Sequence, residues 1–198
     1  MKNTRALLLV SGLIAFSSVG HAGLLIEPHI GYNITGSTSS KSLTVSNATG
    51  TYSDSYHGPQ YGARLGYQYL GLMGGFSYNH ASYTLKKVNN ATATSVDSKR
   101  NDMGVFVGFN APILFRAWLG YSFSVKETKT TSGDYDKGSA TELGLGFTGL
   151  PFLSINLEYK MIDYKTFHND SAGTDSTYSP NRKTNEVVLS VSAPLNFF

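Results

Sequence analysis

Charged residues recur on one face of several alternating stretches of the chain, and their types allow two kinds of chemistry. The acidic members could act in pairs as a general acid and a general base. If they are buried, however, charges of opposite sign must pair or be solvated, which would make them an ion-paired network. We favour the ion-paired network, with a structural role, and keep a narrow conducting pore and an internal active site as alternatives. The set comprises the acids Glu27, Asp102, Glu142, Glu158 and Glu186, the cations Arg64, Arg116 and Lys160, and His29 as a further candidate.

A second candidate site lies in Asn79-His80-Ala81-Ser82, where His80 and Ser82 share one face of a strand. A serine nucleophile and a histidine base are two members of a catalytic triad, and the third is a carboxylate that orients the histidine. The pair resembles the His-x-Ser pair of lipid A deacylases of the PagL type, which implies hydrolysis of lipid A. Those enzymes place a Glu on a neighbouring strand, whereas this chain offers Asn101 and Met103 at the matching height. The sequence therefore favours a non-enzymatic protein, with the hydrolase as an alternative.

The elements that must position these residues are β-strands. In residues 26–35, Ile26, Ile30 and Tyr32 alternate with polar or small residues, and this period of two is typical of a strand with one apolar face. The alternation recurs along the chain in segments of about ten residues, the length that a tilted strand needs to cross a bilayer. The segments are 26–35, 60–69, 74–79, 102–110, 118–125, 142–147, 153–160 and 186–195.

The connections between these eight strands alternate between short and long. An even number of strands, with short turns on one side and long polar loops on the other, is the pattern of a transmembrane β-barrel. The short connections are 70–72, 112–114 and 149–151, and the long ones are 36–58, 86–99, 126–138 and 164–183.

The composition of the two strand faces separates this fold from a soluble barrel, which is the alternative. The polar face is rich in Gly, Ser and Asn, and such small residues suit the narrow interior of an eight-stranded barrel. The apolar face carries aromatic residues near both ends of the strands, as membrane barrels do at the two lipid–water interfaces. We therefore predict an all-β, eight-stranded antiparallel up-and-down transmembrane barrel.

The first 22 residues predict a cleaved secretory signal peptide, which leaves 23–198 as the barrel. Lys2 and Arg5 precede an apolar run over 6–16, and small residues lead to Ala22. The chain has no cysteine, which excludes disulfides and cysteine-ligated metals. Its formal net charge of +3 is too weak and too scattered to indicate nucleic-acid binding. We expect no cofactor, no metal and no nucleic-acid partner.

Two phrases, Tyr61-Gly62-Ala63-Arg64-Leu65-Gly66-Tyr67 and Gly104-Val105-Phe106-Val107-Gly108-Phe109, resemble small bacterial outer-membrane proteins of the OmpA/OmpX type. The resemblance covers about 24–198 and implies a monomer in the outer membrane of a Gram-negative bacterium, surrounded by lipid and lipopolysaccharide. It also implies assembly by periplasmic chaperones and the barrel-insertion machinery, and a surface structural or adhesion role in which the four long loops contact a host or surface ligand. The chain departs from the type in two ways. We expect no periplasmic domain after the barrel, and the apolar positions near the C-terminus are out of step with the final Phe198.

Overall fold

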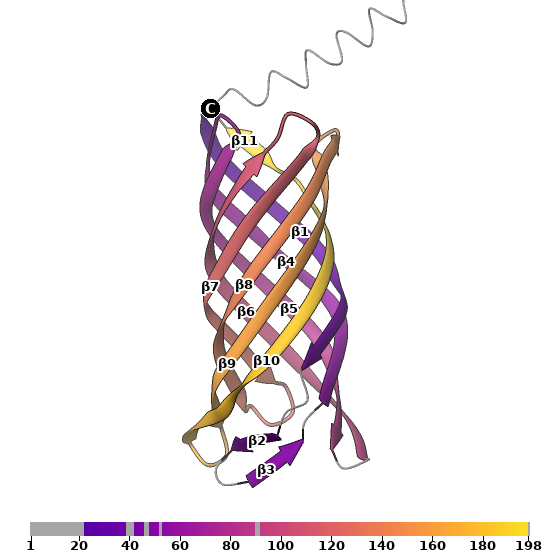
Figure 1. Ribbon diagram of the computed structural model, residues 1–198, viewed down its shortest axis with the longest axis vertical. Coiled ribbons are helices and arrows are strands. Elements are labelled where there is room, and N and C mark those ends of the chain that lie inside the picture. Colours follow the sequence, from indigo (N-terminus) through magenta and orange to yellow (C-terminus); the bar gives the residue numbers. More distant parts are fainter. Residues whose placement is uncertain (1–21, 39–41, 46–47, 52, 90–91, 198) are drawn as a thin grey trace, which may run out of the picture.

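Eight long antiparallel strands form a closed barrel (Figure 1). The computed structural model describes residues 22–38, 42–45, 48–51, 53–89 and 92–197. Each long strand pairs with the next one along the chain, and β1 pairs with β10 to close the ring. Among the described residues, no helix is long and apolar enough to cross a membrane. The long strands are β1 (Gly23–Thr38), β4 (Ser53–Tyr69), β5 (Leu72–Asn89), β6 (Thr92–Asn110), β7 (Phe115–Lys129), β8 (Tyr135–Leu150), β9 (Leu153–Asn169) and β10 (Thr174–Ser192). The short strands are β2 (Ser42–Val45), β3 (Ala48–Thr51) and β11 (Leu195–Phe197).

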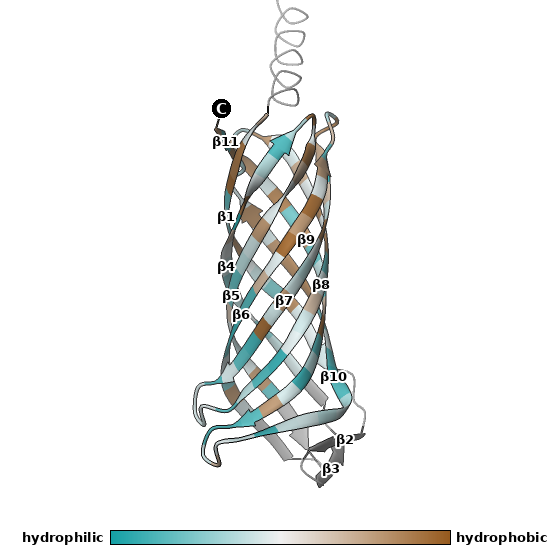
Figure 2. Ribbon diagram, turned by 90° about the vertical axis from the view of Figure 1, so that its left-hand side faces the viewer, coloured by the Kyte–Doolittle hydropathy of each residue, from teal (hydrophilic) through white to brown (hydrophobic). Residues whose placement is uncertain are grey.

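The apolar face of each strand points outward and the polar face points inward. Leu65 and Val107 are 50% and 61% exposed, whereas Arg64, next to Leu65 in the chain, is 3% exposed. Hydrophobic residues gather in the part of the barrel nearer the C-terminus, and the opposite end is more hydrophilic (Figure 2). We call the exposed apolar side chains of the first part the apolar band. The predicted fold and the predicted orientation of the two faces are confirmed.

The three short turns and the end of the chain lie together at one end of the barrel, which we call the turn end (Figure 1). The turns join β4 to β5, β6 to β7 and β8 to β9, as predicted. β11 pairs with the start of β1, and its Leu195 and Phe197 are both exposed on the outer face. Phe198 and residues 1–21 of the predicted signal peptide lie outside the described residues.

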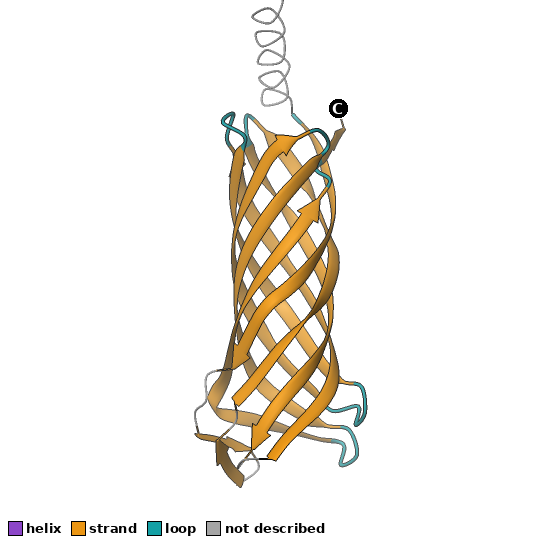
Figure 3. Cartoon of the chain, turned by 90° about the vertical axis from the view of Figure 1, so that its right-hand side faces the viewer, coloured by secondary structure: helices purple, strands orange, loops and turns teal. Residues whose placement is uncertain are grey.

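The predicted lengths of the strands and of the four loops are wrong at the other end, which we call the loop end. The strands continue through most of the four predicted loops (Figure 3), and the connection between β9 and β10 shrinks to 170–173. A 16-residue strand such as β8 is about 50 Å long. At a tilt of about 40° it covers about 40 Å along the barrel axis, whereas the apolar band of such barrels is about 25 Å tall.

The two strand faces exchange their character where the strands leave the apolar band. On β9, Leu157 and Met161 face outward, but beyond them Ile162 and Tyr164 are buried inside and Lys165 is exposed. This inversion has a simple cause, because lipid surrounds the band whereas water surrounds the extension, so that apolar side chains there gain only by facing inward. Two apolar clusters fill the inside of the extension. They contain Val125, Ala140, Ile162, Tyr164 and Tyr178, and Tyr56, Ala81, Tyr83 and Leu85.

Candidate functional site

The interior of the barrel is crossed by a network of ion pairs, and Arg64 on β4 is its first junction. Its guanidinium contacts Glu27 on β1 at 3.0 Å, Glu158 on β9 at 3.1 Å and Glu142 on β8 at 3.5 Å. The guanidinium also lies 4.2 Å from the centre of the Trp118 ring. Because β4 faces β8 and β9 across the barrel, these contacts join opposite walls.

Arg116 on β7 supports the same group from the turn end. It donates to both carboxylate oxygens of Glu27, and to Asn156 and Ser192 at 2.9 Å each. The indole nitrogen of Trp118 donates to Glu142 at 2.8 Å. The turn-side cluster, which we define as Glu27, Arg64, Arg116, Glu142 and Glu158, therefore has cations and carboxylates in direct contact and an aromatic ring between the walls.

A middle cluster continues the network toward the loop end. Lys160 contacts Glu142 at 3.4 Å and Asp102 at 2.9 Å. Asp102 in turn accepts from Arg100 at 2.9 Å, and Arg100 contacts Glu186 at 2.6 Å. Glu142 belongs to both clusters, so a continuous chain of ion pairs runs from Glu27 to Glu186. All of these side chains are buried.

The structure thus brings together every charged residue of the predicted set except His29. His29 is buried, and its Nε2 lies 2.7 Å from the amide oxygen of Asn79, outside the ion pairs. Sequence reasoning missed Arg100, because the predicted strand was started at residue 102. Arg100 shares the parity of Asp102, and extending the alternation by one step would have found it.

An outer cluster of charges lies among the apolar clusters inside the extension beyond the apolar band. Arg182 contacts Asp136 at 2.7 Å and Glu127 at 3.3 Å. Three tyrosine hydroxyls also bind these two carboxylates. Tyr83 and Tyr164 donate to Glu127, and Tyr178 donates to Asp136. Glu127 and Asp136 lie within 126–138, and Arg182 within 164–183, both of which were predicted as loops.

The two carboxyl groups of the outer cluster differ in acidity. Burial raises the pKa of Asp136 above its usual value, and Arg182 offsets this only in part. Burial also acts on Glu127, but Arg182 and the hydroxyls of Tyr164 and Tyr83 outweigh it and keep the pKa of Glu127 below its usual value. Glu127 is therefore the carboxylate that the cluster holds in its charged form.

On the outer face of the barrel, His80 and Ser82 on β5 form a hydrogen-bonded chain with β6. The Oγ of Ser82 lies 3.3 Å from Nε2 of His80, and Nδ1 of His80 lies 2.7 Å from Oδ1 of Asn101. His80 and Asn101 are directly opposed in the strand register. The hydroxyl of Tyr78 also donates to Asn101, at 3.0 Å. The side-chain amide of Asn101 thus occupies the position next to His80 that a carboxylate takes in a catalytic triad.

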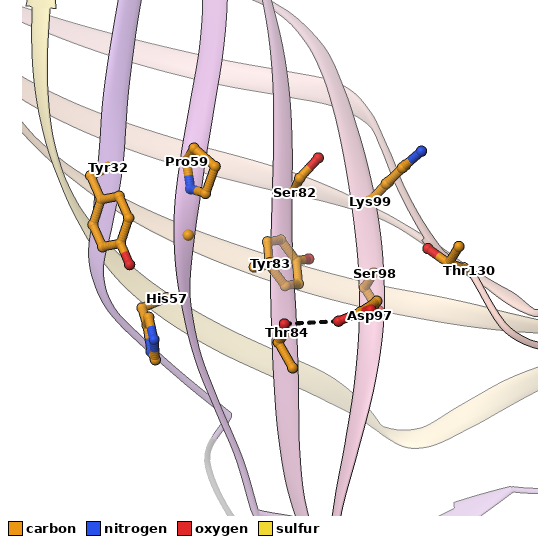
Figure 4. Close-up of a pocket in the computed structure, with 11 residues that line it drawn as sticks. Tyr32, His57, Pro59, Ser82, Tyr83, Thr84, Asp97, Ser98, Lys99 and Thr130 are labelled. Carbon is orange, nitrogen blue, oxygen red and sulfur yellow. Dashed lines mark hydrogen bonds between the residues drawn. The ribbon is translucent and has the colours of Figure 1, made fainter.

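A groove of about 400 Å³ lies beside this chain, over β1, β4, β5 and β6 (Figure 4). Ser82 and Lys99 stand on neighbouring strands at its edge, and Thr84 donates to Asp97 at 2.8 Å within it. Among the described residues, no group of three or more His, Asp or Glu could hold a metal ion. The residues that line the groove are Tyr32, His57, Gly58, Pro59, Ser82, Tyr83, Thr84, Asp97, Ser98, Lys99 and Thr130.

Solved structures of other proteins share this architecture, and two of them match almost their whole length. Neisserial surface protein A (NspA) is 16% identical with a TM-score of 0.51, over 88% of this chain and 99% of that one. The outer-membrane protein OprG from Pseudomonas aeruginosa is 12% identical with a TM-score of 0.53, over 88% of this chain and 98% of that one. The chain has the fold of a small outer-membrane β-barrel. No protein-family model matches the sequence of this barrel, and no curated protein sequence matches it.

Proposed function

We propose that the protein is a monomeric, non-conducting barrel of the bacterial outer membrane with a surface structural or adhesion role. The observation that carries the proposal is the chain of ion pairs from Glu27 to Glu186, which joins opposite walls across the lumen. Buried charges in direct contact close the interior to ions, because a passing ion would have to separate them. Lipopolysaccharide would surround the outer half, and periplasmic chaperones and the barrel-insertion machinery would deliver the chain.

Conductance in a planar lipid bilayer tests this proposal against a small pore. We expect negligible conductance from the unmodified protein. Arg64→Ala should give at most brief, flickering openings, because it leaves unpaired carboxylates that draw water into the interior. Steady, long-lived openings of the unmodified protein would overturn the closed interior and establish the pore.

The adhesion role rests on the loop end, where the β2–β3 hairpin and the turns 130–134 and 170–173 project beyond the strands (Figure 1). Whole cells that display the barrel should bind host or matrix material. A variant in which a short turn replaces 39–52 should bind less, while replacement of the turn-end residues 112–114 by another short turn should change nothing. Equal binding by all three would contradict a ligand at the loop end.

A second function is favoured by the Ser82–His80–Asn101 chain, namely hydrolysis of an acyl ester in the outer leaflet. Ser82 Oγ would attack the ester carbonyl while Nε2 of His80 takes its proton. The C–O bond to the lipid alcohol would then break, and the alcohol would leave with the proton from His80, so that the acyl group remains on Ser82. Water, deprotonated by His80, would hydrolyse this acyl-serine ester, release the fatty acid and restore the Ser82 hydroxyl. The 3.3 Å separation of Ser82 and His80 lies just above the usual range for such pairs before substrate binds. The amide of Asn101 orients His80 but supplies no negative charge to stabilise the imidazolium, so the reaction would be slow.

Mass spectrometry of lipid A from expressing cells tests the hydrolase. The unmodified protein should release an acyl chain, Ser82→Ala should not, and Ser124→Ala on the same outer surface should behave like the unmodified protein. Asn101→Asp should speed the release by supplying the missing carboxylate. Intact lipid A in every sample, including Asn101→Asp, would exclude this function.

A further inference from the structure

The outer surface of the barrel carries its charges at one end only. Followed outward from the turn end, the first exposed charged residue is a lysine on each of β5, β6, β7, β8, β9 and β10, and on β9 it follows the partly buried Asp163. None of the outward-facing residues described near the three turns is charged. We call these lysines the lysine belt. It consists of Lys86, Lys99, Lys126, Lys137, Lys165 and Lys183.

The belt lies directly beyond the apolar band. On β6 it follows Met103, and on β7 it follows Phe123, which are 51% and 55% exposed on the lipid-facing surface. In a membrane barrel this height corresponds to the headgroups of the outer leaflet, where the phosphates of lipid molecules lie. Lysines there face a layer of negative charge, which attracts each of them.

Two lysines of the belt form a pair of like charges on neighbouring strands. Lys126 on β7 and Lys137 on β8 are directly opposed in the strand register. Their ammonium groups lie 4.1 Å and 5.0 Å from the centre of the same ring, that of Tyr135. Among the described residues, neither lysine forms an ion pair with a carboxylate. Like charges in directly opposed positions destabilise a sheet, and an anion bound between them would remove that cost.

The nearby carboxylates are already engaged elsewhere. Glu127 and Asp136, the chain neighbours of the two lysines, point into the barrel and contact Arg182. Asp175 is held by His168 at 2.6 Å, beyond the Tyr135 ring. Lys183, by contrast, lies opposite Asp163 in the register, so the belt is most strongly positive over β6, β7 and β8.

Lys99 extends this positive surface toward the groove. It is exposed on β6 and lies at the edge of the groove, near the hydroxyls of Ser82 and Thr130 (Figure 4). Asp97 on the same face accepts a hydrogen bond from Thr84. Ammonium groups beside hydroxyl donors suit a phosphorylated sugar, which needs both a counter-charge and hydrogen-bond donors.

We propose that Lys126 and Lys137, with Lys99 beside them, bind the phosphate groups of lipid A in the outer leaflet. The proposal rests on the outer-membrane location proposed above, but it requires neither a closed interior nor hydrolysis. Its occupant is a lipid-borne phosphate, because the site is continuous with the apolar band on which the acyl chains would lie.

The experiment measures binding of fluorescent, bisphosphorylated lipid A to the folded barrel in neutral detergent micelles, by anisotropy. The test variant, called the belt variant below, is Lys126→Gln/Lys137→Gln. The matched control is Lys86→Gln/Lys183→Gln, which removes the same charge from β5 and β10, away from the Lys126–Lys137 pair on β7 and β8. Circular dichroism confirms folding of each sample, and the single variant Lys126→Gln serves if the double variant does not fold.

We expect the belt variant to bind at least about tenfold more weakly, because each lysine near a charged headgroup contributes about 1 kcal/mol. The control should change binding less than about twofold, and dephosphorylated lipid A should bind as weakly to the unmodified barrel as lipid A does to the belt variant.

Equal losses in both variants, or equal binding of the two lipids, would overturn the proposal. Displacement of lipid A by millimolar inorganic phosphate would also overturn it, because the site would then bind free anions. If the barrel conducts but these results hold, only the closed interior is wrong.

Discussion

Arg64 is the residue on which most of the interior depends, because it contacts three carboxylates from three different strands. Replacing it by Met keeps most of its volume and removes its charge. We expect the free energy of unfolding to fall by about 3–5 kcal/mol, since Glu27, Glu142 and Glu158 lose a partner that they share. Urea unfolding in lipid vesicles measures this, with the exposed Lys165→Met as the control. A loss no larger than that of the control would mean that water replaces the guanidinium at little cost.

Glu127 gives the stability of the barrel a dependence on acid. Its pKa is below the usual value of 4.5 in the folded barrel, so its contribution is present above that pH and is lost as the pH falls. Glu127→Gln should therefore flatten the decline in the free energy of unfolding between about pH 6 and pH 3. Asp136→Asn is the contrasting variant, because the pKa of Asp136 is raised and its titration favours the folded state as the pH falls. A steeper decline for Glu127→Gln than for the unmodified barrel would show that the sign is wrong.

Single residues were predictable from the sequence wherever the hydropathy of the two strand faces differed. Arg64 and Glu158 are flanked by outward apolar residues, so their inward position followed from parity alone. Glu127 and Arg182 lie in the extension, where their outward-facing neighbours in the chain are polar and water surrounds the barrel. Nothing in those neighbours therefore indicates that Glu127 and Arg182 are buried. The pairing of Asn101 with His80 needed the register between two strands, which a one-dimensional pattern does not contain.

At the scale of the strand, the phase of alternation decides which substitutions the barrel tolerates. Leu145 on β8 faces lipid and is 55% exposed, whereas a side chain on its neighbour Gly144 would fall on the Trp118 ring inside. Leu145→Arg should cost about 2–4 kcal/mol near the middle of the bilayer. Gly144→Arg should fail to fold, because the interior has no room for it.

Urea-dependent folding into vesicles of different thickness separates these two causes. The Leu145→Arg barrel should recover in thin bilayers, which bring water closer to the arginine, and Gly144→Arg should not. Recovery of Gly144→Arg instead would place residue 144 on the outside.

The strand ends were less predictable than the strands, for a reason that belongs to the element. The prediction of each strand depended on an apolar outer face, and that face ends where the bilayer ends. Beyond it on β5, the apolar residues Tyr83 and Leu85 are buried inside, and the polar residues Thr84 and Lys86 are exposed on the outside. A prediction that allows the apolar residues to lie on either face would extend β5 and β6 into the predicted loop 86–99.

At the scale of the whole molecule, the even number of long strands places the turns and the end of the chain on one side (Figure 1). The lysine belt and the outer cluster lie toward the opposite end, and Arg182 keeps the carboxylates of that cluster away from the outer surface. The two ends of the barrel therefore differ in chemistry. One is apolar and uncharged on its outside, which suits insertion through the membrane, and the other is polar and basic, which suits lipid headgroups and water.

This orientation is testable with cysteine labelling, for which the chain is well suited because it contains no cysteine. Ser132→Cys in the β7–β8 turn and Ala172→Cys in the β9–β10 turn should react on intact cells with a maleimide that cannot cross membranes. Ile113, in the β6–β7 turn at the other end, is also exposed. Ile113→Cys should nevertheless react only after the outer membrane is opened, because we expect that turn to face the periplasm. Labelling of Ile113→Cys on intact cells, with Ser132→Cys silent, would reverse the orientation. It would also move the lysine belt to the inner leaflet and away from lipid A.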